Sequence, residues 1–350
     1  MIYCYAGVGG CMDNMGIQNK TKICVIGAGA IGAYLGVRLA HSGAQVSVVA
    51  RGKTLESILA RGWVLEDGGE RLVAKVQAAS DAREFGPQDI VIISVKAYAL
   101  SDIASMVPSL CHADTIVIPA INGIPWWFTD GLSNSERLPR LESLDPQGAI
   151  ASAIEASRII GCVVYASCYS PEPGVSHHSS GERLVFGEIG RCPDALNSNR
   201  LDRVVSRFNA AGLKAEGTQA IRQAVWEKLL GNVCFNPISM LTGSPTDLMI
   251  EDSATYHLFV AMMEEVIAVG AALDIPVEMT PQQRLAITRK LGGIKTSMLQ
   301  DTEAGRPVEV EAIVGAFVEL AERLKMPTPI ASTIYALAHM RAKTLKLLKE

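Results

Sequence analysis

Three polar side chains in the segment WEKLLGNVCFNP have the spacing of one helical face. Lys228, Asn232 and Asn236 follow one another at intervals of four residues, which places them on the same side of an α-helix. An ammonium group can donate a proton to a carbonyl oxygen and stabilise the negative charge that develops there. The two neutral amides can hold a polar substrate without adding charge. A helix whose lysine and asparagines simply face water would show the same spacing, so the pattern alone leaves both interpretations open.

A glycine-rich turn precedes this helix by about 200 residues. Gly27, Gly29 and Gly32 form G-x-G-x-x-G between a predicted strand and a predicted helix. The first glycine permits a tight turn, the second lets backbone approach a pyrophosphate, and the third lets helix and strand pack closely. Phosphates would then face the amino end of the helix. The predicted dinucleotide-binding residues are Gly27, Ala28, Gly29, Ala30, Ile31 and Gly32.

The end of the second predicted strand indicates which dinucleotide binds. NAD sites usually place an acidic residue there to hold the ribose 2′-hydroxyl. This chain has Val-Ala-Arg-Gly-Lys at 49–53 instead. Arg51 can pair with a 2′-phosphate through charge-assisted hydrogen bonds, so we expect NADP(H). The alternative is a solvated surface arginine.

Four further polar residues complete the candidate site. Lys96 and Asn122 each follow a predicted strand, where ligands lie in parallel sheets. Ser297 precedes Met-Leu-Gln-Asp, and Glu309 follows Pro307. Proline at the first position of a helix would place Glu309 in the first turn, where the helix dipole favours a carboxylate. Such a carboxylate could orient a substrate hydroxyl or the lysine, or it could be an ordinary capping acid.

The surrounding pattern predicts an α/β protein with two domains. Strands are expected at 22–26, 45–50, 89–95 and 115–118, and helices at 30–42 and 99–106. This alternation predicts a parallel, doubly wound Rossmann sheet. Residues 131–155 read as an inserted loop with a short helix. The remaining elements of this half are expected to be strands at 161–167, 174–178, 183–187 and 213–216, and a helix at 194–211.

From residue 219 onward the periodicity is helical. Helices are expected at 219–235, 253–273, 281–290, 308–325 and from 328 to the end, the basic segment 341–349 included. We therefore predict an N-terminal extension at 1–20, an NADP-binding Rossmann domain at 21–218, and an all-α substrate and catalytic domain at 219–350.

Composition and charge exclude several classes of function. The 350 residues are 49% hydrophobic and 19% charged, with a net charge of −4, which indicates a compact fold and no nucleic-acid partner. No uninterrupted apolar stretch approaches the roughly 20 residues that cross a bilayer, and residues 1–20 lack a secretory pattern. The eight cysteines form no C-x-x-C pair, and His177 and His178 have no metal-type spacing. We expect reduced cysteines, no metal and a cytoplasmic protein.

Taken together, these segments resemble the ketopantoate reductases, the 2-dehydropantoate 2-reductase family. The resemblance extends from about Lys22 to the C-terminus and rests on GAGAIGAYLG, SVKAYAL, the Asn-Gly at 122–123, KLLGNVCFNP and SMLQDTEAGRPVEVE. It implies a Rossmann domain followed by a helical domain like that of 6-phosphogluconate dehydrogenase. The substrate site is then the cleft between the two domains.

The resemblance also implies roles for the candidate residues. Lys228 matches the family's catalytic lysine and Glu309 its acidic residue. Asn232, Asn236 and Ser297 match the substrate-binding side. Asn122 and Lys96 match the cofactor side, with Asn122 also near the substrate, and Arg51 matches the 2′-phosphate arginine. Asp301 is a plausible neighbour of this set.

The implied activity is the NADPH-dependent reduction of 2-dehydropantoate to (R)-pantoate, a step of pantothenate and coenzyme A biosynthesis. Two alternatives stay open: reduction of another 2-oxo or 3-oxo acid, and a non-catalytic NADP(H)-sensing protein. Trp126 and Trp127 follow Asn122 closely. They could reshape the substrate pocket, lie in the core or form a dimer surface, and the sequence leaves a homodimer open.

Overall fold

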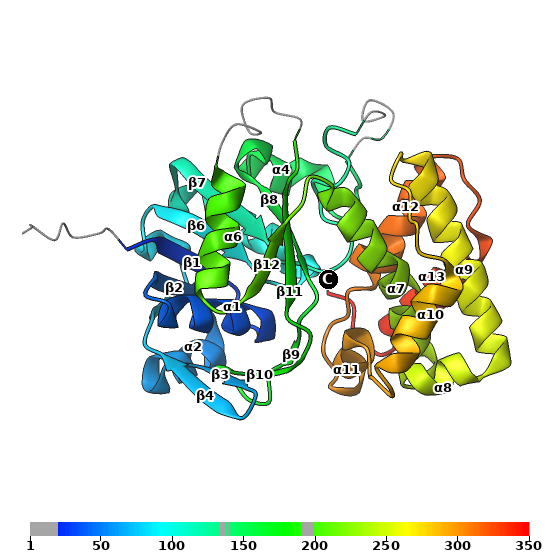
Figure 1. The fold of residues 1–350 in the computed structure, drawn as a ribbon, viewed down its shortest axis with the longest axis horizontal. Coiled ribbons are helices and arrows are strands. Elements are labelled where there is room, and N and C mark those ends of the chain that lie inside the picture. The colour runs from blue at the N-terminus through cyan, green and yellow to red at the C-terminus, as the bar shows by residue number, and fades with distance from the viewer. Residues whose placement is uncertain (1–19, 133–137, 139, 191–198, 350) are drawn as a thin grey trace, which may run out of the picture.

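The computed structural model describes residues 20–132, 138, 140–190 and 199–349. The predicted N-terminal extension therefore lies outside the described residues, except for Lys20. Figure 1 shows a lobe of strands and helices beside a lobe of helices alone, with α7 (Ile221–Thr242) at their junction and the C-terminus between them. The chain passes from strands to helices between Gly217 and Ile221, and we place the boundary of the two domains there.

A five-stranded sheet forms the centre of the first lobe. Its strand order is β5-β2-β1-β6-β7, and every pairing in it is parallel. The strands are β1 (Lys22–Ile26), β2 (Gln45–Val49), β5 (Gln77–Ala79), β6 (Gln88–Ile93) and β7 (Cys111–Pro119). The chain moves from β1 to β2 on one side and later from β6 to β7 on the other. This confirms the predicted Rossmann sheet and places its topological switch point between β1 and β6.

Alternation along the strands supplies both faces of this sheet with apolar side chains. Ile23 and Val25 of β1 pack in the cluster that contains α1 (Ala30–His41) and α6 (Arg200–Ala210). Cys24 and Ile26 enter a second cluster with α3 (Leu100–Ala104). The strands are buried on both faces, as parallel sheets require.

Two smaller sheets extend the first lobe. One has the order β4-β3-β10-β9 and the other β12-β11-β8. Their strands are β3 (Trp63–Asp67), β4 (Glu70–Ala74), β8 (Ile160–Val164), β9 (Ser167–Tyr169), β10 (Val175–Ser180), β11 (Arg183–Glu188) and β12 (Lys214–Gly217). Helix α2 (Gly52–Arg61), β3, β4 and β5 were not predicted. The predicted insertion at 131–155 contains the short helix α4 (Ala149–Ala153), as expected.

The second lobe is helical, as predicted. Its elements after α7 are α8 (Thr246–Glu251), α9 (Ser253–Ala272), α10 (Pro281–Lys290), α11 (Ser297–Glu303), α12 (Ala316–Arg323) and α13 (Pro329–Thr344). The predicted end of α7 at residue 235 is wrong, because the helix continues through Pro237 to Thr242. Proline removes a backbone hydrogen bond there, but residues 235–239 are all buried, so packing keeps the helix intact.

The predicted helix at 308–325 is wrong at its beginning. The backbone N–H of Val308 donates to the carbonyl of Leu347 at 3.0 Å, which holds residues 306–309 outside the helix. Helical structure begins at Val310 with a π-helical turn, Glu311–Gly315. Glu309 therefore precedes the helix, and its carbonyl accepts from Ile313 N–H at 3.2 Å. The predicted helix to residue 349 ends at Thr344, which frees Leu347 for this contact.

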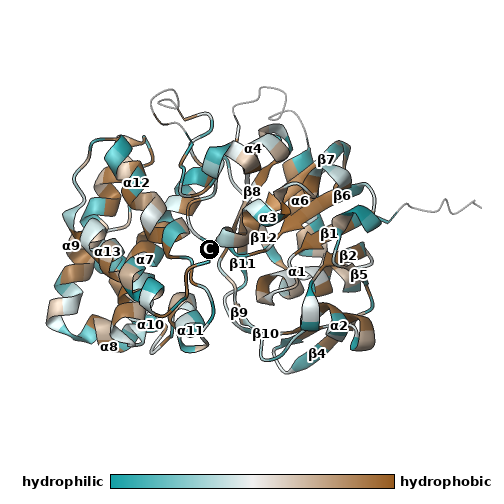
Figure 2. Cartoon of the chain, turned by 180° about the vertical axis from the view of Figure 1, so that it is seen from behind, coloured by the Kyte–Doolittle hydropathy of each residue, from teal (hydrophilic) through white to brown (hydrophobic). Residues whose placement is uncertain are grey.

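One hydrophobic core joins the two lobes. The cluster below the sheet continues without a break from Val91 and Val117 to Val225, Leu229 and Val233 of α7. Figure 2 shows apolar residues concentrated in the central strands and within the helical lobe. Helix α9 is long and apolar enough to cross a membrane, yet its Phe259 and Val266 belong to this core. The lobes are thus held together by buried apolar area.

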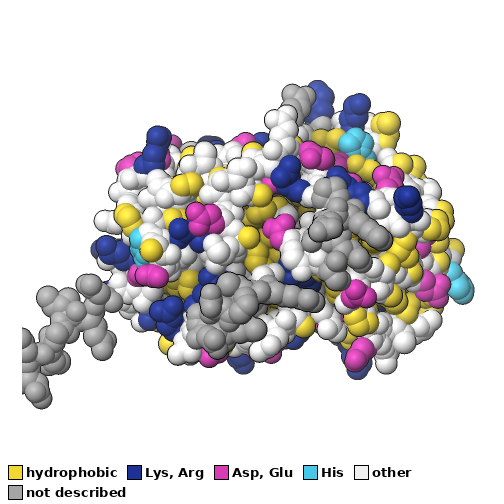
Figure 3. All heavy atoms as spheres, turned by 90° about the horizontal axis from the view of Figure 1, so that it is seen from above, with side chains coloured by type: hydrophobic (Ala, Val, Ile, Leu, Met, Phe, Trp, Pro, Cys, Tyr) yellow, Lys and Arg dark blue, Asp and Glu magenta, His cyan; other side chains and the backbone are white. Residues whose placement is uncertain are grey.

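The surface carries charges of both signs, and the cysteines of the described residues are unpaired. On the face seen in Figure 3, lysine and arginine side chains are interspersed with aspartate and glutamate. The five cysteines in the described part of the chain are free thiols, and Cys24, Cys162 and Cys234 are buried. No group of three or more histidine, cysteine or acidic side chains suited to a metal occurs among the described residues.

The glycine turn provides a stability test with a built-in control. A Cβ at Gly32 would lie 2.0 Å from the carbonyl oxygen of Gly27, whereas a Cβ at Gly29 would have no atom within 4 Å. Gly32→Ala should lower the free energy of unfolding by about 1–3 kcal/mol through overpacking. Gly29→Ala should change it by no more than about 0.5 kcal/mol. Urea denaturation of both variants measures the difference, and equal midpoints would contradict this account of the turn.

Candidate functional site

Most of the candidate residues lie near the carboxyl ends of the central strands. The turn after β1 is fixed by Gly27 N–H, which donates to Val49 O of β2 at 3.1 Å. The hydroxyl of Ser94, just after β6, donates to Gly27 O at 2.8 Å. Gly27 has a φ of 107°, a conformation that glycine adopts readily. The turn is therefore rigid and open at the switch point, where dinucleotides bind in such folds.

The amino end of α1 suits a phosphate group. Gly29 is its N-cap residue, with no side-chain cap and no acidic residue in the first turn. The space beside Gly29 is free of protein atoms within 4 Å of a Cβ position. Backbone N–H groups of the first turn lack intrahelical partners, and the helix dipole adds positive potential. The residues present thus fit the pyrophosphate of a dinucleotide.

Arg51 lies beyond the end of β2, at the N-cap position of α2. It is exposed, and so is Lys53. Within the described ranges the guanidinium of Arg51 takes part in no ion pair, so its charge is not neutralised by the protein. An unpaired arginine at this place fits a 2′-phosphate.

Lys96 bridges the two lobes. Its ammonium lies 2.9 Å from Asp301 Oδ2 and 3.1 Å from Glu309 Oε2. Burial alone would lower the pKa of Lys96, but the two carboxylates raise it well above its ordinary value. Arg306 binds the other oxygen of Asp301 at 2.9 Å. Lys96 is therefore a fixed cation whose charge the helical lobe balances.

Glu309 contacts a different lysine from the one expected. Its Oε1 accepts from the backbone N–H of Ala97 at 2.9 Å, and its Oε2 pairs with Lys96. Only 6% of Glu309 is exposed. The hydrogen bonds of Lys228 go elsewhere, so Glu309 does not directly orient Lys228 in this structure. Its negative charge nevertheless favours the protonated form of Lys228.

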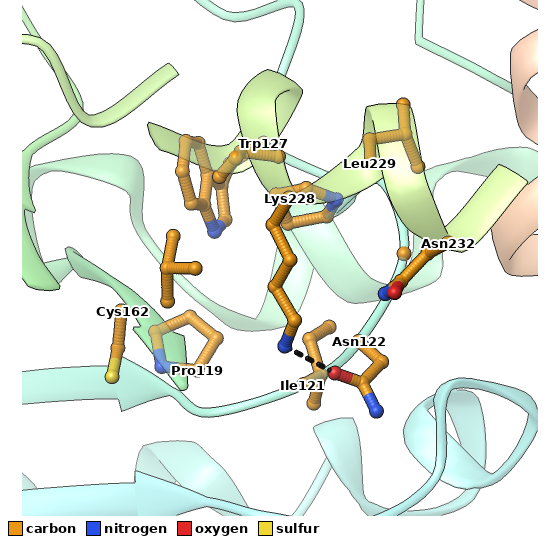
Figure 4. A pocket seen from close by; sticks show the side chains of 12 residues that line it. Pro119, Ile121, Asn122, Trp127, Cys162, Lys228, Leu229 and Asn232 are labelled. Carbon is orange, nitrogen blue, oxygen red and sulfur yellow. Dashed lines mark hydrogen bonds between the residues drawn. The ribbon is translucent and has the colours of Figure 1, made fainter. Parts of the chain in front are cut away.

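The side chain of Lys228 extends from α7 to the strand lobe, where its ammonium makes two hydrogen bonds. It donates to Asn122 Oδ1 at 2.7 Å and to the backbone carbonyl of Val164 at 2.5 Å. Figure 4 shows the side chain extending from the helix toward Asn122. Burial lowers the pKa of Lys228 to about 8. An ammonium with this pKa can release a proton near neutral pH.

Asn122 is positioned by a close contact between the lobes. The following Gly123 has a φ of 84°, and a Cβ there would lie 2.3 Å from Ala312 O. Ile124 N–H donates to the same carbonyl at 3.0 Å. The loop after β7 is therefore pinned to the helical lobe, with Asn122 directed at Lys228.

Lys228, Asn122 and Asn232 line one small pocket (Figure 4). Asn236 lies one turn further along α7 and is only 5% exposed. Ser297 is the first residue of α11 and is exposed. Its neighbour Thr296 makes the contact with α7, through a 2.6 Å hydrogen bond to Ser239. The structure thus brings Lys228, Asn122 and Asn232 together, whereas Asn236 and Ser297 do not line this pocket.

The sequence pointed to Trp127 as a possible pocket residue, but not to Cys162 or to the backbone of Val164. The carbonyl of Val164 holds Lys228, and Cys162 and Trp127 line the same space. A backbone carbonyl leaves no signal in the side-chain pattern. Trp126 and Trp127 are 4% and 1% exposed, so they lie in the core and cannot form a dimer surface. His177 and His178 lie in the strand lobe, away from this pocket, and His178 Nδ1 lies 2.8 Å from Asp67 Oδ1.

Comparison with known proteins supports this picture. Residues 23–191 match the model of the ketopantoate reductase PanE/ApbA family, and residues 220–342 match its C-terminal model. A 2-dehydropantoate 2-reductase of Mesorhizobium japonicum is 39% identical over 92% of this chain and 98% of its own length.

Solved structures share the fold. One from Ralstonia solanacearum MolK2, named as a candidate ketopantoate reductase, is 40% identical with a TM-score of 0.88, over 94% of this chain and 99% of its own. D-mandelate dehydrogenase, solved with NADH and anilino(oxo)acetate, is 19% identical with a TM-score of 0.79, over 93% of this chain and all of its own. The latter shows the fold alone.

The fold, the lysine-centred cleft and these relatives lead to one assignment. The chain belongs to the ketopantoate reductase family, whose members are nicotinamide-dinucleotide-dependent oxidoreductases.

Proposed function

We propose that this protein reduces 2-dehydropantoate to (R)-pantoate with NADPH, as a cytoplasmic step of pantothenate and coenzyme A biosynthesis. The observation that carries the proposal is the ammonium of Lys228, held in the cleft with a pKa of about 8. The Mesorhizobium japonicum relative bears the name of this activity.

The hydrogen bonds of Lys228 give its ammonium a direction. An ammonium has three N–H donors, of which Asn122 and the Val164 carbonyl accept two. The third is left for a substrate oxygen. Both fixed partners are neutral, so they position the charge without neutralising it. The full charge can then stabilise the oxygen as it becomes negative.

NADPH, when bound, supplies the hydride that reaches the carbonyl carbon. The protein's part is to hold the ketone oxygen against Lys228 Nζ and to deliver a proton to it. Asn232 lies one helical turn from Lys228 in the same pocket and is placed to bind the substrate's polar groups. We propose the same role for Asn236, one turn further along α7, and for Ser297 at the start of α11.

Glu309 and Asp301 are proposed to act through Lys96. Their two carboxylates hold Lys96 across the junction of the lobes, and the Ala97 N–H fixes Glu309. We propose that this ion cluster sets the separation of the lobes and keeps Lys96 beside the cofactor. Glu309 additionally favours the charged form of Lys228.

The preference for NADPH rests on Arg51. The end of β2 presents Arg51 and Lys53 to solvent, which suits a 2′-phosphate, and residues 49–53 contain no carboxylate for a 2′-hydroxyl. The open turn at Gly29 accommodates the pyrophosphate.

A second candidate is the same reduction of a bulkier 2-oxo acid. The indole of Trp127 lines the pocket beside Lys228, where it gives a large apolar wall to whatever group is attached to the ketone. A sensor without catalysis is less well supported, because it needs no partly buried ammonium with a lowered pKa.

A substrate panel tests the function directly. Purified protein should oxidise NADPH with 2-dehydropantoate faster than with aryl 2-oxo acids, 3-oxo acids or buffer alone. Lys228→Ala should lower kcat by at least about 10²-fold, with NADPH binding by fluorescence nearly unchanged. Preferred turnover of an aryl oxo acid would select the second candidate. Turnover of none, with tight NADPH binding, would favour the sensor.

The pH profile of reduction should report the ionisation of Lys228. The acid must be protonated, and its pKa is about 8, so kcat/KM should be high at pH 7 and fall as the pH rises through about 8. NADPH binding, measured over the same range, is the control for loss of cofactor. A profile flat to pH 10 would show that Lys228 is not the proton donor.

Cofactor selectivity should depend on Arg51. Arg51→Ala removes a charge-assisted interaction of about 1.5–3 kcal/mol, so KM for NADPH should rise about tenfold or more, while KM for NADH changes little. Arg61→Ala is the matched control, because Arg61 lies at the other end of α2 and pairs with Glu172. Equal effects of Arg51→Ala on both cofactors would contradict the proposed 2′-phosphate site.

A further inference from the structure

An arginine of the helical lobe lies against the same helix as Lys228. Arg284 belongs to α10, and its guanidinium covers Gly231 of α7 so closely that a Cβ there would lie 2.3 Å from Nη2. Gly231 is the residue before Asn232 and three after Lys228. Residues three apart are neighbours on a helix surface, so Gly231 adjoins Lys228. The guanidinium therefore lies beside the part of α7 that carries Lys228.

The charge of Arg284 is not balanced by the protein. Its Nη1 donates to Thr288 Oγ1 at 2.7 Å, and its Cζ lies 5.8 Å from the centroid of the Phe235 ring. Among the described residues it has no carboxylate partner. Burial lowers its pKa, and the ionisable groups that act on it are Cys234 and Tyr165, which are neutral at pH 7. A partly buried cation without a counter-ion is costly, which is unexpected in a purely structural residue.

Tyr165 is affected by both cations. Lys228 Nζ lies 5.9 Å from the centroid of its ring. Burial raises the pKa of Tyr165, and Arg183 and Arg284 are among the charges that oppose this rise. The charge of Arg284 thus acts on the same aromatic side chain that Lys228 approaches.

Two cations of the cleft, Lys96 and Lys228, already have partners. Lys96 is matched by Asp301 and Glu309, and Lys228 is held by neutral groups for use at a ketone oxygen. A 2-oxo acid brings a carboxylate on the carbon next to the ketone. An anion that reaches Lys228 with its ketone oxygen therefore needs a second positive group close by.

We propose that Arg284 is a substrate-binding residue that recognises the carboxylate of the 2-oxo acid while Lys228 binds the ketone oxygen. This assignment rests on the proposed function. A guanidinium offers paired N–H donors that match a carboxylate. It would hold the acid so that its ketone oxygen faces Lys228. It would also make the enzyme select oxo acids over neutral ketones.

The test compares a 2-oxo acid with its methyl ester. Arg284→Gln should raise KM for the acid at least tenfold and change kinetics with the ester by no more than about threefold. Arg289→Gln is the matched control, since Arg289 lies on the same helix and donates to the carbonyl of Ile250. Equal losses with acid and ester would assign Arg284 a structural role and overturn the proposal.

A second variant moves the charge without removing it. Gly231→Ala places a methyl group where the guanidinium now lies, so Arg284 must shift. The ratio of kcat/KM for acid over ester should fall in this variant as well. An unchanged ratio in both Gly231→Ala and Arg284→Gln would exclude carboxylate recognition at this position.

Binding of oxamate, measured by calorimetry with NADP⁺ present, separates this proposal from the proposed function. Oxamate carries the carboxylate but is not reduced. If no oxo acid is turned over and oxamate still binds the native protein at least tenfold more tightly than Arg284→Gln, the reaction is wrong and the carboxylate site stands. If oxo acids are reduced and oxamate binds both proteins equally, the reaction stands and the role of Arg284 is wrong.

Discussion

The site depends on one ammonium group that two neutral acceptors hold out of bulk water. Lys228 donates to Asn122 and to the carbonyl of Val164, which come from the ends of β7 and β8. Burial lowers its pKa to about 8 without giving it a direct carboxylate partner. A salt bridge at this position would have raised the pKa and made the proton harder to release. The neutral partners therefore keep Lys228 usable as an acid.

The rest of the structure holds the two lobes so that Lys228 reaches Asn122 and Val164. A continuous apolar core runs from the sheet into α7, and the Lys96 ion cluster and the Ile124 to Ala312 hydrogen bond tie the lobes at the cleft. Because α7 carries Lys228 while the strand lobe carries its partners, a small shift between the lobes would break both hydrogen bonds. The buried core of α7 makes such a shift costly. Fold stability and the proposed proton transfer thus depend on the same interface.

Much of this arrangement followed from the sequence, and the departures have physical causes. The Rossmann sheet, the glycine turn and the helix of Lys228 have strong local patterns, and the structure contains all three. The continuation of α7 through Pro237 and the late helix start at Val310 depend on tertiary contacts, which no local pattern records. The pairing of Glu309 with Lys96 instead of Lys228 has the same origin. Val164 contacts Lys228 through its backbone carbonyl and Arg284 packs on Gly231 of another helix, so neither contact could be recognised from residue type or spacing.

The most direct test of the central claim is a crystal structure of the protein with NADP⁺ and (R)-pantoate. The account predicts that Lys228 Nζ lies within hydrogen-bond distance, about 2.7–3.1 Å, of the pantoate 2-hydroxyl oxygen, with Asn122 still bonded to the ammonium. A complex in which that oxygen contacts other groups while Lys228 points away from the nicotinamide would contradict it.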